Sequence, residues 1–101
     1  MIRKETQTSL GFDPALVMDE WRRFYDWAVL SRQKVEYIDM ISGLGQKFSG
    51  LLSAYRLAKR PQRRERLSQE LLSTFEAMKT FYESLPPGKR IALTLQAHDT
   101  A

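Results

Sequence analysis

The residues with the clearest chemistry are the cations in the segment from Arg56 to Arg66. This segment holds six of the sixteen Lys and Arg residues and a single acid, Glu65, so its local charge is +5 while the whole chain carries +4. Arginine supplies five of the six cations, and its planar guanidinium forms paired hydrogen bonds with carboxylates and phosphates. Pro61 separates two helical patterns and places the charge at a corner. We therefore expect either a contact surface for an anionic partner or a solvated turn.

Three of these arginines are placed where they destabilise the helix that contains them. Arg63, Arg64 and Arg66 fall in the first turns after Pro61, where the helix dipole disfavours each cation by about 0.3 to 1 kcal/mol. Because this placement lowers stability, it favours a role in binding. We predict Arg60, Arg63 and Arg64 as partner-binding residues, and we expect the partner to be a protein with an acidic surface or a nucleic acid.

Nucleic acid has the weaker support of the two. Tyr55 is the one aromatic residue near the cations, so a platform for stacking bases is missing. A total charge of only +4 also limits non-specific affinity for phosphates. Binding of nucleic acid through the Arg56–Arg66 patch of a dimer is therefore the alternative function.

No group of residues has the composition of a catalytic or metal site. His98 is the only histidine and the chain has no cysteine, which excludes a zinc site built from those ligands. Asp19 lies three residues before Arg22, and Glu20 lies three residues before Arg23, which is the spacing of ion pairs along a helix. We expect no catalytic residues, no cofactor and no metal, and we expect the protein not to be an enzyme.

An aromatic cluster supplies the second candidate surface. Trp21, Phe24, Tyr25 and Trp27 put four rings within seven residues. At about 100° per residue the first three share a face, whereas Trp27 points away, so the helix is apolar on two sides. We predict Trp21, Tyr25 and Trp27 as partner-binding residues, because Trp and Tyr are enriched in interfaces. The alternative is a helix buried at the centre of a three-helix bundle.

The elements that must position these residues are helical, which predicts an all-α fold. Asp13 and Pro14 mark a helix start, as the N-cap and the first helical residue. From there apolar residues recur every three or four positions for over forty residues, with one skip at Ser31. A second pattern begins after Pro61 and is stopped by the Pro-Pro-Gly that follows Leu85.

We expect one helical domain over residues 1–101, divided into four parts. The parts are a flexible N-terminal arm (1–12), a first helical arm (13–60), a second helix (61–85) and a C-terminal tail (86–101). In the tail Ile91, Leu93 and Leu95 alternate as in a strand, but a short helix also fits, so its conformation stays open.

The two helical parts form an antiparallel hairpin whose first arm is either broken near Gly43 or continuous. Gly43 and Gly45 each cost roughly 1 kcal/mol relative to Ala inside a helix. Yet the apolar pattern continues through them, and small residues at 42, 45, 49 and 53 form a stripe on which another helix could lie. An unbroken first arm is ~69 Å long against ~35 Å for the second. Its apolar face then needs a second chain. We expect an antiparallel hairpin or a small helical bundle that forms a homodimer, because the aromatic helix shows too much apolar surface for a monomer of this length.

Composition restricts the remaining classes. No stretch free of charged residues exceeds eight, far below the length of a membrane span, so we expect no membrane partner. No signal peptide is visible, and the absence of cysteine fits the cytoplasm. The sequence thus favours a small non-enzymatic protein-interaction module, a regulator or inhibitor that masks a protein partner through helical apolar faces and the basic corner.

Overall fold

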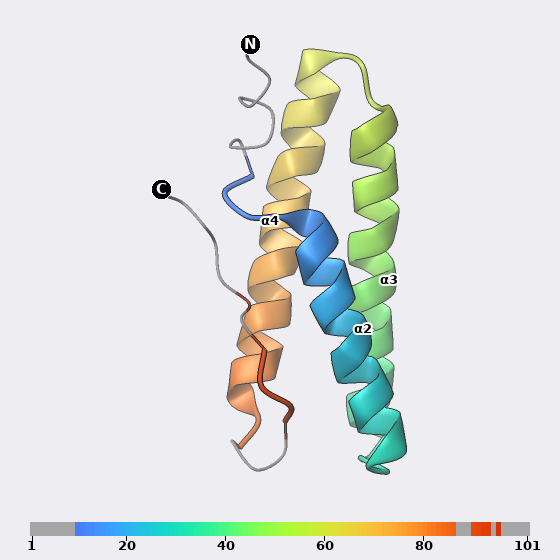
Figure 1. The fold of residues 1–101 in the computed structure, drawn as a ribbon. Helices are drawn as coiled ribbons and strands as arrows, with labels where there is room; N and C mark the ends of the chain where they lie inside the picture. The colour runs from blue at the N-terminus through green and yellow to red at the C-terminus, as the bar shows by residue number, and fades with distance from the viewer. Residues whose placement is uncertain (1–9, 87–89, 94, 96–101) are drawn as a thin grey trace.

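Three helices make up most of the described part of the chain. The computed structural model describes residues 10–86, 90–93 and 95. Within these residues the helices are α2 (Pro14–Leu30), α3 (Val35–Leu57) and α4 (Pro61–Ser84), and no strand is present (Figure 1). The predicted all-α class is therefore confirmed.

The start of α2 follows from two adjacent residues. Asp13 has an extended backbone, and one of its carboxylate oxygens accepts the N–H groups of Ala15 and Leu16 at 3.0 and 3.4 Å. Pro14 occupies the first helical position, where its missing N–H removes no helical hydrogen bond. The helix start predicted from the sequence is confirmed.

The first helical arm is split between Leu30 and Val35. Arg32 has a left-handed backbone with φ of 57°, and its N–H donates to the carbonyl of Val29 at 3.1 Å. The N–H of Gln33 donates to the carbonyl of Ala28 at 3.0 Å. These two bonds form a Schellman motif, which satisfies the last carbonyls of a helix and ends it. The chain then turns, and α2 lies against α3.

The structure has no break near Gly43, because α3 runs through Gly43 and Gly45 without interruption. A Cβ atom at Gly45 would lie 2.9 Å from Cδ1 of Trp21, whereas a Cβ at Gly43 would have no neighbour within 4 Å. The indole N–H of Trp21 also donates to the carbonyl of Ile41 at 2.8 Å. Glycine at position 45 therefore allows α2 to approach α3 closely.

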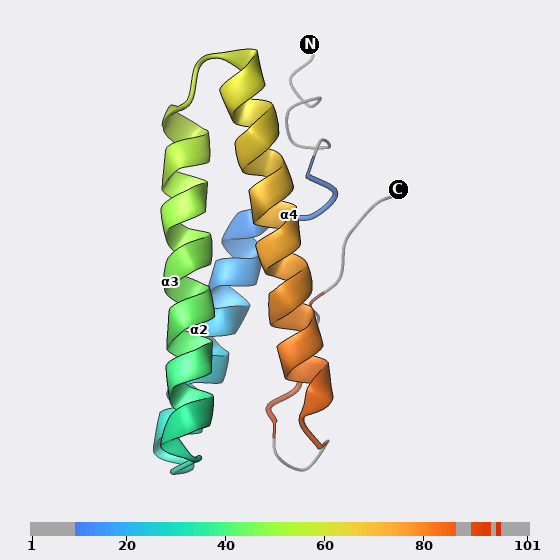
Figure 2. The same ribbon diagram turned by 180° about the vertical axis from the view of Figure 1, so that it is seen from behind.

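Because the first arm is split after Leu30, the helices α3 and α4 have nearly equal lengths. Since α3 has 23 residues and α4 has 24, each is about 35 Å long at the rise of an α-helix. They form the predicted antiparallel hairpin, and α2 crosses behind α3 in Figure 2. The unbroken 69 Å arm does not exist, so its length no longer requires a second chain.

The core lies where the three helices meet. Phe24, Phe48 and Phe75, one from each helix, are fully buried. The ring of Phe24 meets that of Tyr82 edge-on with centroids 5.4 Å apart, so side chains of α2 reach α4.

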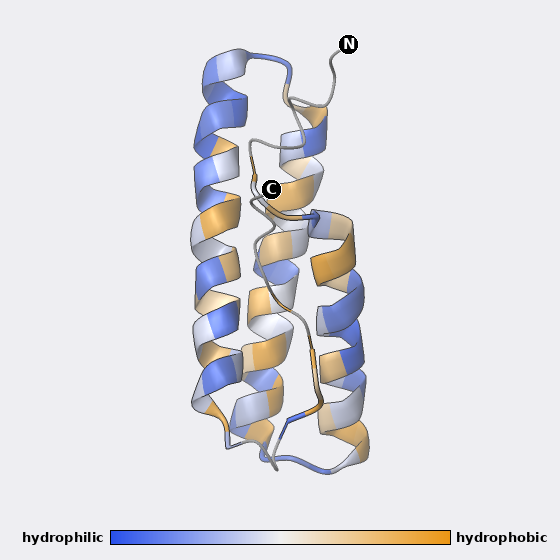
Figure 3. Cartoon of the chain, turned by 60° about the vertical axis from the view of Figure 1, so that its left-hand side comes forward, coloured by the Kyte–Doolittle hydropathy of each residue, from blue (hydrophilic) through white to orange (hydrophobic). Residues whose placement is uncertain are grey.

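Two non-helical segments cover the side of the bundle between α2 and α4, which we call the α2–α4 face (Figure 3). One contains Leu10 and Phe12, both buried, although they belong to the arm that was expected to be flexible. Residues 1–9 of that arm lie outside the described residues. The other segment, which we call the C-terminal strap, consists of residues 90–93 and 95, and it is not helical. The short-helix alternative therefore does not hold for the described part of the tail, where neither helix nor strand is present.

Candidate functional site

The turn between α3 and α4 presents the basic corner, residues 56–66, at one end of the bundle (Figure 1). Ala58 and Arg60 have extended backbones, so the chain changes direction between two firmly bounded helices. The exposed cations of the corner are Arg56, Lys59, Arg60, Arg63 and Arg66. Five positive charges are thus attached to a rigid support, which reduces the backbone entropy lost when they bind a partner.

Arg64 differs from the other cations because its guanidinium is used within the chain. Its Nη1 donates to the carbonyls of Tyr55 and Ala58 at 3.0 and 3.2 Å, and its Cζ lies 4.3 Å from the centroid of the Tyr55 ring. These carbonyls lie at the negative end of α3, where a cation is favourable, although the Tyr55 carbonyl also accepts the N–H of Ala58 at 3.3 Å. Arg64 therefore caps α3, which explains a cation in the first turn of α4 without any partner.

Leu57 gives the corner an apolar component. Its side chain is 78% exposed, and it follows Arg56 and lies two positions before Lys59. Tyr55, in contrast, is buried beneath Arg64. The corner therefore combines ionic groups with one aliphatic side chain, and it offers no exposed ring on which a base could stack.

The structure does not bring the three predicted aromatic contact residues together on one surface. Trp21 is only 2% exposed and lies in the core, with its N–H bonded to α3. Trp27 is half-buried and packs against the core, while Tyr25 is exposed on the outside of α2. Phe24 separates the two tryptophans, with ring centroids 5.0 Å from Trp21 and 6.1 Å from Trp27. The three-helix alternative explains this cluster better than a continuous interface does.

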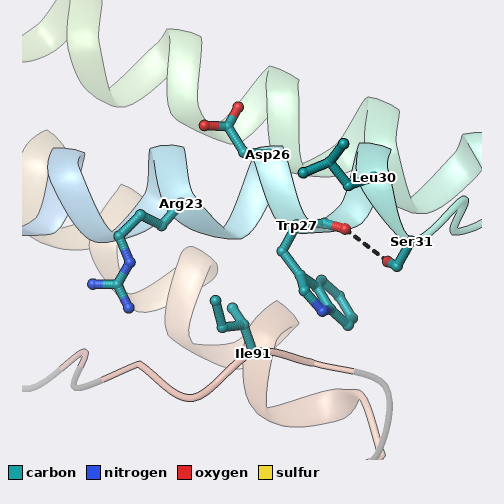
Figure 4. Close-up of a pocket in the computed structure, with 6 residues that line it drawn as sticks. All are labelled: Arg23, Asp26, Trp27, Leu30, Ser31 and Ile91. Atoms are coloured by element: carbon teal, nitrogen blue, oxygen red, sulfur yellow. Dashed lines mark hydrogen bonds between the residues drawn. The ribbon is translucent and has the colours of Figure 1, made fainter.

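A shallow hollow lies where α2 ends beside the C-terminal strap. Its volume is about 410 Å³, and its lining residues are Arg23, Asp26, Trp27, Leu30, Ser31 and Ile91. Figure 4 shows Trp27, Arg23 and Ile91 directed toward the space between α2 and the strap, with Asp26 on the opposite side of the helix. Sequence reasoning found Trp27 but missed the hollow, because Ile91 reaches it from a segment whose path the helical pattern does not predict.

The described residues contain no group of three or more His, Cys, Asp or Glu side chains that could hold a metal ion. None of the helices α2, α3 and α4 is long and apolar enough to cross a membrane. Comparisons with protein-family models, curated proteins and solved structures find no match to this chain. Function is therefore argued from the chain's own geometry.

Proposed function

We propose that the protein is a small non-enzymatic interaction module that binds an acidic protein surface through its basic corner. The observation that carries this proposal is the cluster of five exposed cations beside the exposed side chain of Leu57. Arginine-rich surfaces that also offer an apolar side chain resemble the centre of a protein interface more than a phosphate-binding groove.

The proposed mechanism has two steps that depend on different forces. The cations first attract the acidic partner over a distance of about one Debye length, ~8 Å at physiological salt. Paired hydrogen bonds from Arg60 and Arg63 to carboxylates then fix the orientation, while Leu57 loses contact with water. The bound partner is covered over the area of contact, so we propose that the protein regulates or inhibits the partner by masking it.

Nucleic acid remains the second candidate because arginine also binds phosphates. The two candidates differ in their response to salt. Binding to phosphates weakens steeply as salt rises, since each contact releases counterions. An interface that also buries Leu57 retains an apolar contribution that salt does not screen.

Affinity capture from an extract of the source organism tests the proposal, with nuclease added to one half of each sample. The variant Arg60→Gln/Arg63→Gln/Arg66→Gln removes three exposed charges from the corner and leaves Arg64 in place. Its matched control, Arg22→Gln/Lys34→Gln/Lys47→Gln, removes three exposed charges elsewhere. We expect a nuclease-resistant protein to bind wild type and control, and to be reduced about tenfold or more with the corner variant. Equal capture by both variants would contradict the proposal.

We also propose a homodimer, for which two highly exposed apolar side chains are candidate contacts. At the turn between α2 and α3, Leu30 is 82% exposed and Val35 is 66% exposed. Light scattering should find dimers of the wild type and monomers of Leu30→Lys/Val35→Lys. Leu72→Lys, which also removes an exposed aliphatic side chain, is the control and should remain dimeric. A monomeric wild type would rule the dimer out.

A further inference from the structure

Two segments of the chain cover the α2–α4 face. In one of them Leu10 and Phe12 are buried, and the Phe12 ring stacks on Phe75 of α4 with centroids 4.3 Å apart. This segment is a turn, because Gly11 between the two residues has a φ of 75°. Leu95 of the C-terminal strap belongs to the same buried cluster, so the turn and the strap share one apolar core.

The strap packs on this face through alternate residues. Leu95 is buried, Ile91 and Leu93 are half-buried, and Ala92 between them is exposed. Alternate residues therefore face the bundle, as in an edge strand that lies on an apolar surface. The strap thus shows which chemistry fits this face: a chain with apolar side chains at every second position.

Tyr82 holds the strap by its main chain. The hydroxyl of Tyr82 donates to the carbonyl of Ile91 at 2.5 Å and accepts the N–H of Leu93 at 2.9 Å. One side chain thus serves an acceptor and a donor two residues apart, as a neighbouring strand would. Because both bonds go to main-chain atoms, any extended segment in this position could make them. In such recognition the main-chain bonds give affinity and the alternate side chains give specificity.

The strap leaves part of the site unfilled. The hollow of about 410 Å³ lies directly against Ile91, between that side chain and Trp27 (Figure 4). An aromatic ring in place of Ile91 would occupy more of this space and contact the Trp27 indole. Arg23, at the edge of the hollow, is exposed and could pair with a carboxylate on the bound segment.

We propose that the α2–α4 face is a binding site for an extended segment of a partner protein, and that the C-terminal strap occupies this site within the free chain. The partner segment carries apolar side chains at alternate positions, an aromatic residue at the position of Ile91, and an acidic residue that reaches Arg23. The site is separate from the basic corner and does not depend on what the corner binds.

Competition with the strap determines the affinity of the partner segment. A covalently attached strap acts at a high effective concentration, so a separate peptide binds an intact chain weakly. Weakening the strap therefore has to strengthen peptide binding. A purely structural strap gives the opposite result, because its loss damages the core without creating a site.

The test uses the full chain carrying Leu95→Asp, which weakens the strap, and compares it with the wild type by fluorescence anisotropy. The probe is a labelled peptide of residues 88–97 with Ile91→Trp and Ala92→Glu. We expect the peptide Kd to be about tenfold or more lower on Leu95→Asp than on the wild type. A control peptide that also carries Leu93→Asp and Leu95→Asp should bind neither chain. Failure of the first peptide to bind a folded Leu95→Asp chain would overturn the proposal.

If Leu95→Asp does not fold, hydrogen exchange on the wild type distinguishes a strap that opens from one that is a permanent part of the core. We expect the Leu93 amide to exchange about a hundredfold faster than the amides of Phe48 and Met78, because the strap opens while the helices stay folded. Excess peptide should then shift the ring resonances of Tyr82. Equal protection of all three amides, or unchanged Tyr82 resonances, would make the strap a permanent part of the core.

Discussion

At the scale of single residues, the same side-chain type has different roles within a few positions. Arg63 and Arg64 are adjacent, but Arg63 is exposed, whereas Arg64 lies over Tyr55 and donates two hydrogen bonds to α3. Helix positions differ by about 100°, so neighbours point to different sides. Charge counted along the sequence therefore overstates the number of cations that are available to a partner.

Replacement of Arg64 by Ala should lower the free energy of unfolding by about 1 to 2 kcal/mol, because two carbonyls of α3 lose a charged donor. Urea denaturation measures this change. Arg63→Ala is the matched control and should change the free energy by less than about 0.5 kcal/mol. Equal effects of the two substitutions would show that Arg64 does not cap α3.

The glycines of α3 give a second contrast between residues of one type. Gly45→Ala should lower stability by about 1 to 3 kcal/mol, since the new Cβ meets the buried ring of Trp21. Gly50→Ala has no neighbour within 4 Å, and it should raise stability by up to about 1 kcal/mol through helix propensity. Thermal unfolding and the near-ultraviolet circular dichroism of tryptophan report both effects. A stabilising Gly45→Ala would mean that α2 does not approach α3 as described.

At the scale of elements, the ends of the helices decide the fold. Both α3 and α4 are followed by an arginine that returns to the last turn: Arg64 to Tyr55, and Arg90 to Tyr82. Arg90 donates to the carbonyl of Tyr82 at 2.8 Å and its Cζ lies 4.6 Å from the centre of the ring. Each arginine thus supplies a donor to a helix end and covers an aromatic ring, which joins the following segment to that helix.

The end of α2 carries a residue that is poorly suited to its conformation. Arg32 has φ of 57°, a region that costs a residue with a Cβ roughly 1 kcal/mol relative to glycine. Arg32→Gly should therefore raise stability by about 0.5 to 1 kcal/mol in chemical denaturation. Arg22→Gly, at an exposed position inside α2, should lower it by about 1 kcal/mol. A loss of stability in Arg32→Gly would argue against the Schellman turn.

The turn at Arg32 shows why only part of the fold could be predicted from the sequence. The start of α2 at Pro14 and the extent of α4 were predictable, because Asp13 and the prolines at 61 and 86 act locally. The turn after Leu30 was not, since the position that usually carries glycine carries arginine. Gly43 and Gly45 lie inside α3 instead, where Gly45 makes room for Trp21 and Gly43 has no close neighbour. The skip in the apolar pattern at Ser31 was the available signal.

The candidate site likewise contains features that the sequence predicts and features that it does not. Exposed cations at Arg60 and Arg63 follow from their place around Pro61, as predicted. The burial of Trp21 depends on α2 folding back over α3, and the capping role of Arg64 depends on where Tyr55 lies. Both are tertiary contacts, which neither periodicity nor charge counting can supply.

At the scale of the whole molecule, the basic corner is distinct from the other two proposed contact surfaces. The basic corner joins α3 to α4, whereas the hollow beside Trp27 and the exposed Leu30 lie where α2 ends and turns toward α3. Figure 1 places these two turns at opposite ends of the bundle. One chain could therefore hold an acidic partner at its corner while an extended segment occupies the α2–α4 face.

Site-specific photocrosslinking from position 57 tests the central claim most directly, because Leu57 is exposed within the basic corner. A photoreactive residue at 57 should give a nuclease-resistant adduct with one acidic protein, and the adduct should disappear when Arg60→Gln/Arg63→Gln/Arg66→Gln is added. The same photoreactive residue at the exposed position of Ala77 on α4 is the control and should give no such adduct. An adduct with nucleic acid, or no adduct from position 57, would contradict the account.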